Sequence, residues 1–113
     1  MGKYFIDEKD THRINFPDSE WIDIKPELSQ ADADYIMRQM TDAKLGSTME
    51  IDIKLGRLPL LERSIIAWSF TDGDGKSVPV NGENIAQLRS KYRILVFKEI
   101  DRLNAEAQGF AKN

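Results

Sequence analysis

The acidic, glycine-rich residues 72–75 come closest to the spacing of a metal site. An EF-hand loop starting there would need oxygen ligands at its positions 1, 3 and 5, glycine at 6 and glutamate at 12. Glu83 falls at position 12, but Lys76 stands at position 5 and Ser77 at position 6. A cation in place of a ligand argues against calcium, so we expect no metal site and interpret the segment as a tight turn. The residues of this turn are Asp72, Gly73, Asp74 and Gly75.

The other titratable residues offer little chemistry. His12 is the single histidine, and beside Thr11 and Arg13 we expect it to be solvated rather than catalytic. Glu50 and Asp52 point outward in an alternating segment, where solvated carboxylates are common. Cysteine is absent, which excludes thiolate ligands, cysteine nucleophiles and disulfides. We therefore predict a protein that is not an enzyme, with no catalytic residue and no cofactor.

Size and charge narrow the class of protein. The length predicts a single domain, residues 1–113, in which residues 1–13 are a flexible or strand-forming arm. A hydrophobic content of 41% and a charged content of 31% are typical of a globular chain. The net charge of −3 is interspersed and leaves no basic stripe for phosphates, so we exclude nucleic acid as a partner. No apolar run approaches the roughly 20 residues of a membrane span, so we exclude a membrane as well.

The N-terminal part predicts a small β-structure. Ile14 and Phe16 belong to one weakly alternating segment, and residues 21–25 form a second, richer in β-branched and aromatic side chains. Proline and small polar residues at 17–19 mark a turn between them. We expect a hairpin or meander in which residues 12–16 pair with residues 20–25.

The clearest helix signal covers residues 30–42. Ser29 and Asp32 have the spacing of a capping box, in which each side chain binds the backbone amide of the other residue. Apolar residues then recur three and four positions apart, which predicts one apolar helix face. This face carries Ala33, Ile36, Met37 and Met40.

Two further elements are predicted in the middle of the chain. Residues 49–55 alternate strictly between apolar and charged residues, which favours a half-buried strand over a flexible arm. Pro59 suits the first turn of a second helix. Leu61, Ile65 and Trp68 have helical spacing, so we expect this helix to continue through Trp68 as a broad, buried element.

The C-terminal part predicts a short helix followed by a long one. Asn81 is a suitable N-cap, and Ser90 and Lys91 mark a bend between the two helices. The expected fold is therefore α+β, mainly helical with three to four helices and a small N-terminal β-hairpin or meander. The residues expected in its core are Trp21, Trp68, Ile65, Leu88 and Tyr92.

The long helix carries apolar residues on two sides. At about 100° per residue, Ile94 and Phe97 fall opposite Tyr92. Either another element or a bend covers this second side, or it is a patch for self-association or for a partner. Methionines adapt easily to different partners, although a core role for each also stays open. The candidate partner-binding residues are Ile94, Phe97, Met37 and Met40.

Residues 66–80 are the most distinctive part of the chain, with the sequence IAWSFTDGDGKSVPV. The pattern W-S-F-x-D-x-D-G-K-x-V-P-V, after a strand at 21–24 and a capped helix, resembles a group of small bacteriophage proteins. These proteins are encoded among the tail genes of long-tailed, siphovirus-type phages and prophages and are described as tail assembly chaperones. The resemblance extends over residues 14–107, although the strand-like residues 46–56 depart from a chiefly helical protein.

The resemblance implies a non-enzymatic binding protein. Such chaperones bind the tape-measure protein, help to recruit tail-tube subunits, tend to form homo-oligomers and act in the cytoplasm of the host bacterium. Small head–tail connector and tail-completion proteins have a similar size and also combine helices with a few strands. The alternative is therefore a structural component of the phage particle, located in the virion.

Overall fold

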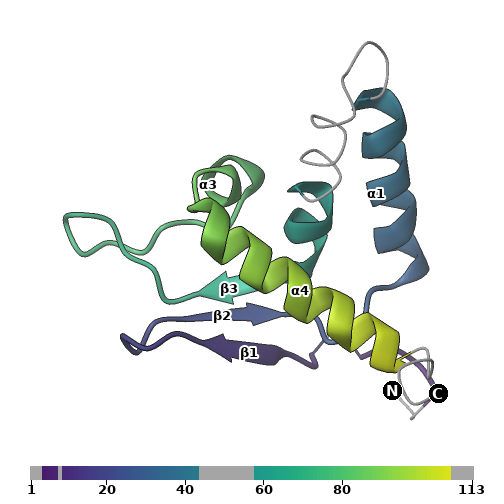
Figure 1. Cartoon of the computed structure of the whole chain (residues 1–113), viewed down its shortest axis with the longest axis horizontal. Helices are drawn as coiled ribbons and strands as arrows, with labels where there is room; N and C mark the ends of the chain where they lie inside the picture. The colour runs from purple at the N-terminus through teal and green to yellow at the C-terminus, as the bar shows by residue number, and fades with distance from the viewer. Residues whose placement is uncertain (1–3, 8, 44–57, 108–113) are drawn as a thin grey trace.

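The computed structural model describes residues 4–7, 9–43 and 58–107. The elements of these residues are β1 (His12–Asn15), β2 (Trp21–Ile24), α1 (Gln30–Ala43), a helical segment at 58–64, β3 (Ile65–Trp68), α3 (Gly82–Ala86) and α4 (Ser90–Ala107) (Figure 1). The predicted α+β class is confirmed, with helices around an antiparallel sheet. The strand expected at residues 49–55 lies outside the described residues.

The sheet has the strand order β1-β2-β3, with both pairs antiparallel. The predicted hairpin is confirmed, because Ile14 pairs with Ile22 and Asn15 with Trp21. Successive strand residues point to opposite faces, so Ile14, Ile22 and Ile24 share the inner face and are buried there. Trp21 follows the other parity and therefore lies on the outer face.

The prediction of a helix through Trp68 is wrong beyond residue 64. The chain leaves the helical segment there and enters β3, where β-branched and aromatic residues pair with β2. The register shifts so that Ile24 faces Ile65 while Asp23 faces Ala67, which leaves Ile66 as the extra residue of a bulge. The bulge turns both Ile65 and Trp68 inward, so a strand reproduces the spacing of a helix face.

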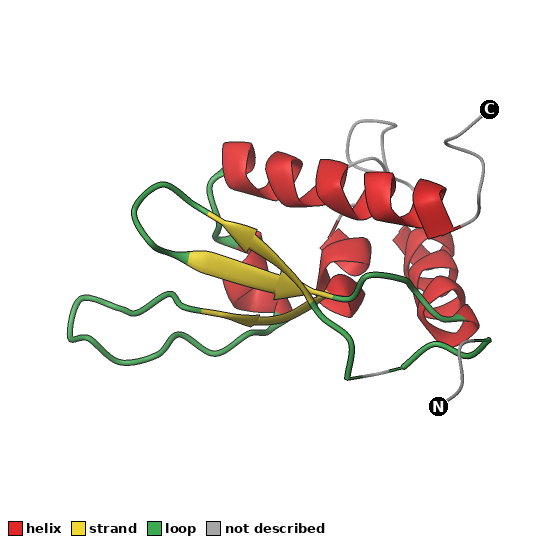
Figure 2. Ribbon diagram, turned by 90° about the horizontal axis from the view of Figure 1, so that it is seen from below, coloured by secondary structure: helices red, strands yellow, loops and turns green. Residues whose placement is uncertain are grey.

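Helix α4 covers the inner face of the sheet, and Figure 2 shows no described helix over the outer face. Val96 and Ile100 on its inner side are almost fully buried. Neither α4 nor any other helix in the described part of the chain combines the length and the apolar character needed to cross a membrane. The buried apolar core consists of Ile14, Ile22, Ile24, Leu61, Ile65, Trp68, Ile85, Val96 and Ile100.

The predicted helix starts form as the sequence indicates. The Ser29 hydroxyl accepts the Asp32 amide at 3.2 Å, and the Asp32 carboxylate accepts the Ser29 amide at 3.0 Å, which completes the capping box of α1. The Asn81 side chain accepts the Asn84 amide at 2.9 Å as the N-cap of α3. The expected break between a short and a long helix is also present, but at residues 87–89, because Ser90 and Lys91 already belong to α4.

Candidate functional site

The distinctive segment 66–80 forms a second hairpin that extends from β3. The Val78 amide donates to the Phe70 carbonyl at 3.0 Å, and Thr71 bridges Ser77. The indole nitrogen of Trp68 donates to the Val78 carbonyl at 2.6 Å, so the buried ring ties the returning arm to the core. The tryptophan of the motif therefore has a structural function.

The turn of this hairpin is held by Asp72. One oxygen of its carboxylate, Oδ1, accepts the amides of Asp74 at 2.8 Å and Lys76 at 3.0 Å. The Asp72 amide donates to the Lys76 carbonyl, and Gly75 adopts a φ of 80°, which glycine tolerates without strain. Among the described residues, no group of three or more metal-ligating side chains gathers here or elsewhere. Residues 72–75 thus form the tight turn that we predicted.

Ser69 joins this hairpin to the first one. Its hydroxyl accepts the Trp21 amide at 2.8 Å and lies 2.7 Å from Oε2 of Glu20, to which it donates. The Ser69 amide also donates to the Trp21 carbonyl at 3.1 Å. These bonds fix the start of β2 against the end of β3 and hold the Glu20 carboxylate at this end of the sheet.

An aromatic cavity of about 350 Å³ opens at the same end of the sheet. The Phe16 ring lies 5.5 Å from Tyr92 in an edge-to-face arrangement and 6.2 Å from Phe70. Phe70 is in turn 5.4 Å from Trp68, so the cavity wall rests on the core. The residues that line the cavity are Phe16, Pro17, Asp18, Glu20, Phe70 and Tyr92.

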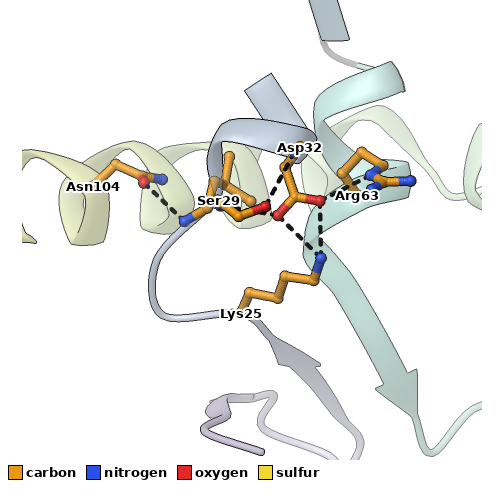
Figure 3. Close-up of polar contacts among 6 residues, drawn as sticks. Lys25, Ser29, Asp32, Arg63 and Asn104 are labelled. Carbon is orange, nitrogen blue, oxygen red and sulfur yellow. Dashed lines mark hydrogen bonds and ion pairs between the residues drawn. The ribbon is translucent and has the colours of Figure 1, made fainter. Parts of the chain in front are cut away.

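A polar cluster lies at the opposite end of β2, around the almost fully buried Asp32 (Figure 3). The Lys25 ammonium contacts both carboxylate oxygens, at 3.0 and 3.1 Å, and Nε of Arg63 donates to Oδ1 at 2.9 Å. The Ser29 amide completes the set of donors. Burial acts to raise the pKa of Asp32, but the Ser29 amide, Lys25 and Arg63 together hold it below its ordinary value.

The Asp32 cluster connects two helical elements and the end of β2. Lys25 follows β2, Asp32 lies in the first turn of α1, and Arg63 comes from the segment 58–64, where it also covers the Tyr35 ring at 4.9 Å. Nearby, the Leu28 amide contacts the Asn104 side chain of α4 at 3.4 Å (Figure 3). A cavity of only about 50 Å³ adjoins this cluster, too small for anything beyond water. The cluster contributes to the fold, because its hydrogen bonds tie the end of β2 and the segment 58–64 to the first turn of α1.

His12 is not the solvated side chain that the sequence suggested. Its Nε2 lies 2.7 Å from Oε2 of Glu99, which connects β1 to α4. Arg102 donates to both oxygens of Glu99, at 2.8 and 2.9 Å, and also contacts Glu106. The hydrogen bonds from Arg102 are the main cause that lowers the pKa of Glu99 to about 2, burial opposes them, and His12 adds to them. Sequence spacing gave no signal for this contact, since the partners lie far apart in the chain.

The predicted partner-binding residues lie on two helices, α1 and α4, and differ in exposure. Ile94 on α4 and Met37 on α1 are exposed, with exposed fractions of 37% and 62%. Phe97 is half-buried and interacts with other residues of the chain. Leu95, which the sequence did not suggest as a binding residue, is 43% exposed. The side chain of Met40 lies outside the described residues.

Most residues predicted for the core do lie in or against it. Ile65 and Trp68 are buried, and Leu88 packs against the core. Tyr92 is half-buried against Phe16. Trp21 is the exception, because strand parity places its ring on the outer face, where the Arg13 guanidinium covers it at 3.8 Å.

No protein-family model, curated protein or solved structure matches this chain.

Proposed function

We propose that the chain is a non-enzymatic phage tail assembly protein, a chaperone that binds the tape-measure protein through apolar helix surfaces. The observation that carries this proposal is the exposed pair Ile94 and Leu95 on the outer side of α4. The inner side of the same helix contributes Val96 and Ile100 to the core. The resemblance of residues 66–80 to tail assembly chaperones supplies the class of partner.

The outer side of α4 has the character of a protein contact. Ile94 and Leu95 lie beside the exposed Lys91 and Lys98, whose aliphatic stems extend the apolar area while their ammonium groups stay in water. Burying such side chains against a helical partner yields about 25 cal/mol for each Å² of apolar area removed from water. The flanking cations favour partner helices with acidic residues beside their apolar stripe.

Met37 provides a second exposed apolar position, on α1. Its unbranched, polarizable side chain can adapt to irregular surfaces, which suits a chaperone that binds many similar segments of a long protein. The carboxylates of Asp32 and Glu99, in contrast, are each held by several donors of this chain. Engagement of these acids within the fold supports binding rather than catalysis.

The test is to co-express the chain with the tape-measure protein of the same gene cluster and to measure how much tape-measure protein stays soluble. An Ile94→Ser/Leu95→Ser variant should lose most of the solubilising effect while keeping its thermal unfolding midpoint. Ile66→Ser is the matched control, because Ile66 is a similarly exposed isoleucine, at 40%, but lies on β3. A double variant that solubilises its partner as well as the original chain would contradict the proposed surface.

A structural role in the phage particle is the competing outcome. Mass spectrometry of purified particles distinguishes the two functions, because an assembly chaperone is absent from the finished virion. Stoichiometric amounts of the chain in the particles would favour a head–tail connector or tail-completion protein instead. The same experiment decides between the host cytoplasm and the virion as its final location.

A further inference from the structure

The aromatic cavity combines two chemical features. Three aromatic rings come from different parts of the chain. Phe16 directly follows β1, Phe70 lies two residues after β3, and Tyr92 belongs to the first turn of α4. Asp18 and Glu20 add two carboxylates to the same lining. Aromatic rings carry negative potential on their faces, so rings and carboxylates together attract a cation.

Hydrogen bonds fix the carboxylates of Asp18 and Glu20, but no ion pair with a described residue neutralises their charge. Asp18 accepts the Glu20 amide at 3.3 Å, and Glu20 accepts the Ser69 hydroxyl at 2.7 Å. Among the described residues, no ion pair involves either acid, and the cavity lining contains no lysine, arginine or histidine. Outside the lining, Lys91 lies over the Tyr92 ring at 5.0 Å.

On the outer face of the sheet, an aromatic ring and a carboxylate also lie close together, and there an arginine of the chain binds both. There the Arg13 guanidinium lies 3.8 Å over the Trp21 ring and binds both oxygens of Asp23, at 2.8 and 3.1 Å. An aromatic face, a carboxylate and an arginine thus form one unit. At the cavity the rings and the carboxylates are present, and none of the described residues that line it is an arginine.

We propose that the aromatic cavity receives an arginine side chain of a partner protein. A guanidinium is planar and weakly hydrated, so it can stack on a ring and donate two parallel hydrogen bonds to a carboxylate at once. A lysine ammonium is a strongly hydrated point charge and uses the aromatic wall less well. The site goes beyond the proposed function, because its lining does not include Ile94 or Leu95 and it does not depend on the partner's being a tape-measure protein.

The test is an NMR titration of the full chain with the capped peptide acetyl-Gly-Arg-Gly-amide, with acetyl-Gly-Leu-Gly-amide as the apolar comparison. The arginine peptide should shift the ring signals of Phe16, Phe70 and Tyr92 in a saturable manner, with a dissociation constant in the millimolar range. The leucine peptide should bind about two- to fivefold more weakly, the ratio that corresponds to roughly 0.5–1 kcal/mol per exposed cation–π contact. Raising the salt concentration should weaken only the arginine peptide.

Asp18→Asn/Glu20→Gln removes both charges while keeping the oxygens that accept the structural hydrogen bonds. This variant should weaken binding of the arginine peptide by about threefold or more, in line with exposed ion pairs. Glu27→Gln/Asp101→Asn is the matched control, since it removes the same charge at exposed positions outside the cavity and should leave the affinity unchanged. Equal affinity for the two peptides, shifts outside the cavity, or no loss in the cavity variant would each overturn the proposal.

Discussion

Two acidic regions flank β2, and they use their carboxylates differently. Beyond its C-terminal end, Asp32 is buried and accepts hydrogen bonds from Lys25, Arg63 and the Ser29 amide. Before its N-terminal end, Asp18 and Glu20 line an open aromatic cavity without an ion pair among the described residues. The fold thus surrounds the first carboxylate with cations, whereas the other two form no ion pair with a described residue.

The difference follows from the desolvation cost of charge. A buried carboxylate loses its hydration, so it persists only where the chain itself supplies donors and cations. Solvent still reaches the acids at the cavity, so they are tolerated although no described cation forms an ion pair with them. Substitutions at the two ends of β2 should therefore affect stability at one end and binding at the other.

The largest effect is expected where the aromatic region joins the core. Trp68→Ala removes a buried ring, its contact with Phe70 and its hydrogen bond to the Val78 carbonyl. The free energy of unfolding should fall by roughly 3–5 kcal/mol, the usual cost of emptying a buried tryptophan site. Urea denaturation followed by circular dichroism measures the loss. A change below about 1 kcal/mol would mean that the ring is not a core element.

The second largest effect is expected at the polar cluster. Asp32→Ala leaves Lys25 and Arg63 without their shared carboxylate and removes half of the capping box. We expect a loss of about 2–3 kcal/mol, less than for a fully buried pair because solvent reaches both cations. The same urea measurement tests this value. Asp34→Ala, on the exposed side of the same helical turn, should cost much less.

Acid should weaken the ion pairs that build the fold. The folded-state pKa of Glu99 is lowered from 4.5 to about 2, mainly by Arg102, and the pKa of Asp32 is lowered as well. Because both values are depressed, the stability they contribute is present above the unfolded pKa and is lost as the pH falls towards the folded pKa. Unfolding free energies measured between about pH 4.5 and 2 should decline. Arg102→Gln should reduce the share of this decline that comes from Glu99, and an unchanged pH profile would exclude that ion pair as its source.

The sequence predicts local features well because each depends on neighbouring residues. The capping box of Ser29 and Asp32, the Asn81 N-cap, the turn at Asp72 and the first hairpin all form as expected. These features depend on hydrogen bonds between residues at most four positions apart or on a short turn.

Features that depend on tertiary pairing escaped prediction. The bulge at Ile66 gives a strand the spacing of a helix face, so periodicity alone misassigned residues 65–68. Trp21 was expected in the core on grounds of size, but strand parity decides its face. The His12–Glu99 pair and the cavity formed by Phe16, Phe70 and Tyr92 join residues whose proximity no spacing reveals.

Two serines, one near each end of β2, should affect stability in opposite directions when their hydroxyls are removed. Ser64, whose carbonyl accepts the Lys25 amide, is fully buried, and its hydroxyl has no hydrogen-bond partner among the residues that the structure describes. Ser64→Ala should therefore raise the free energy of unfolding by up to about 1 kcal/mol, because an unsatisfied buried hydroxyl is removed. Ser69→Ala should lower it by about 1 kcal/mol, because this hydroxyl bonds both Trp21 and Glu20. Thermal unfolding of both variants tests whether stability rises in one and falls in the other. A loss of stability in Ser64→Ala would show that its hydroxyl has a hydrogen-bond partner.

The smallest stability effect is expected at the aromatic cavity itself. Asp18→Asn keeps the oxygen that accepts the Glu20 amide and removes an exposed charge that no described cation neutralises. Its free energy of unfolding at pH 7 should stay within about 0.5 kcal/mol of the original, as for most exposed positions. Asp32→Asn, the same chemical change at the other end of β2, should be clearly destabilising in the same urea experiment. If the two variants lost equal stability, the Asp18 carboxylate would serve the fold as Asp32 does, and a partner's arginine would have no unused charge to meet.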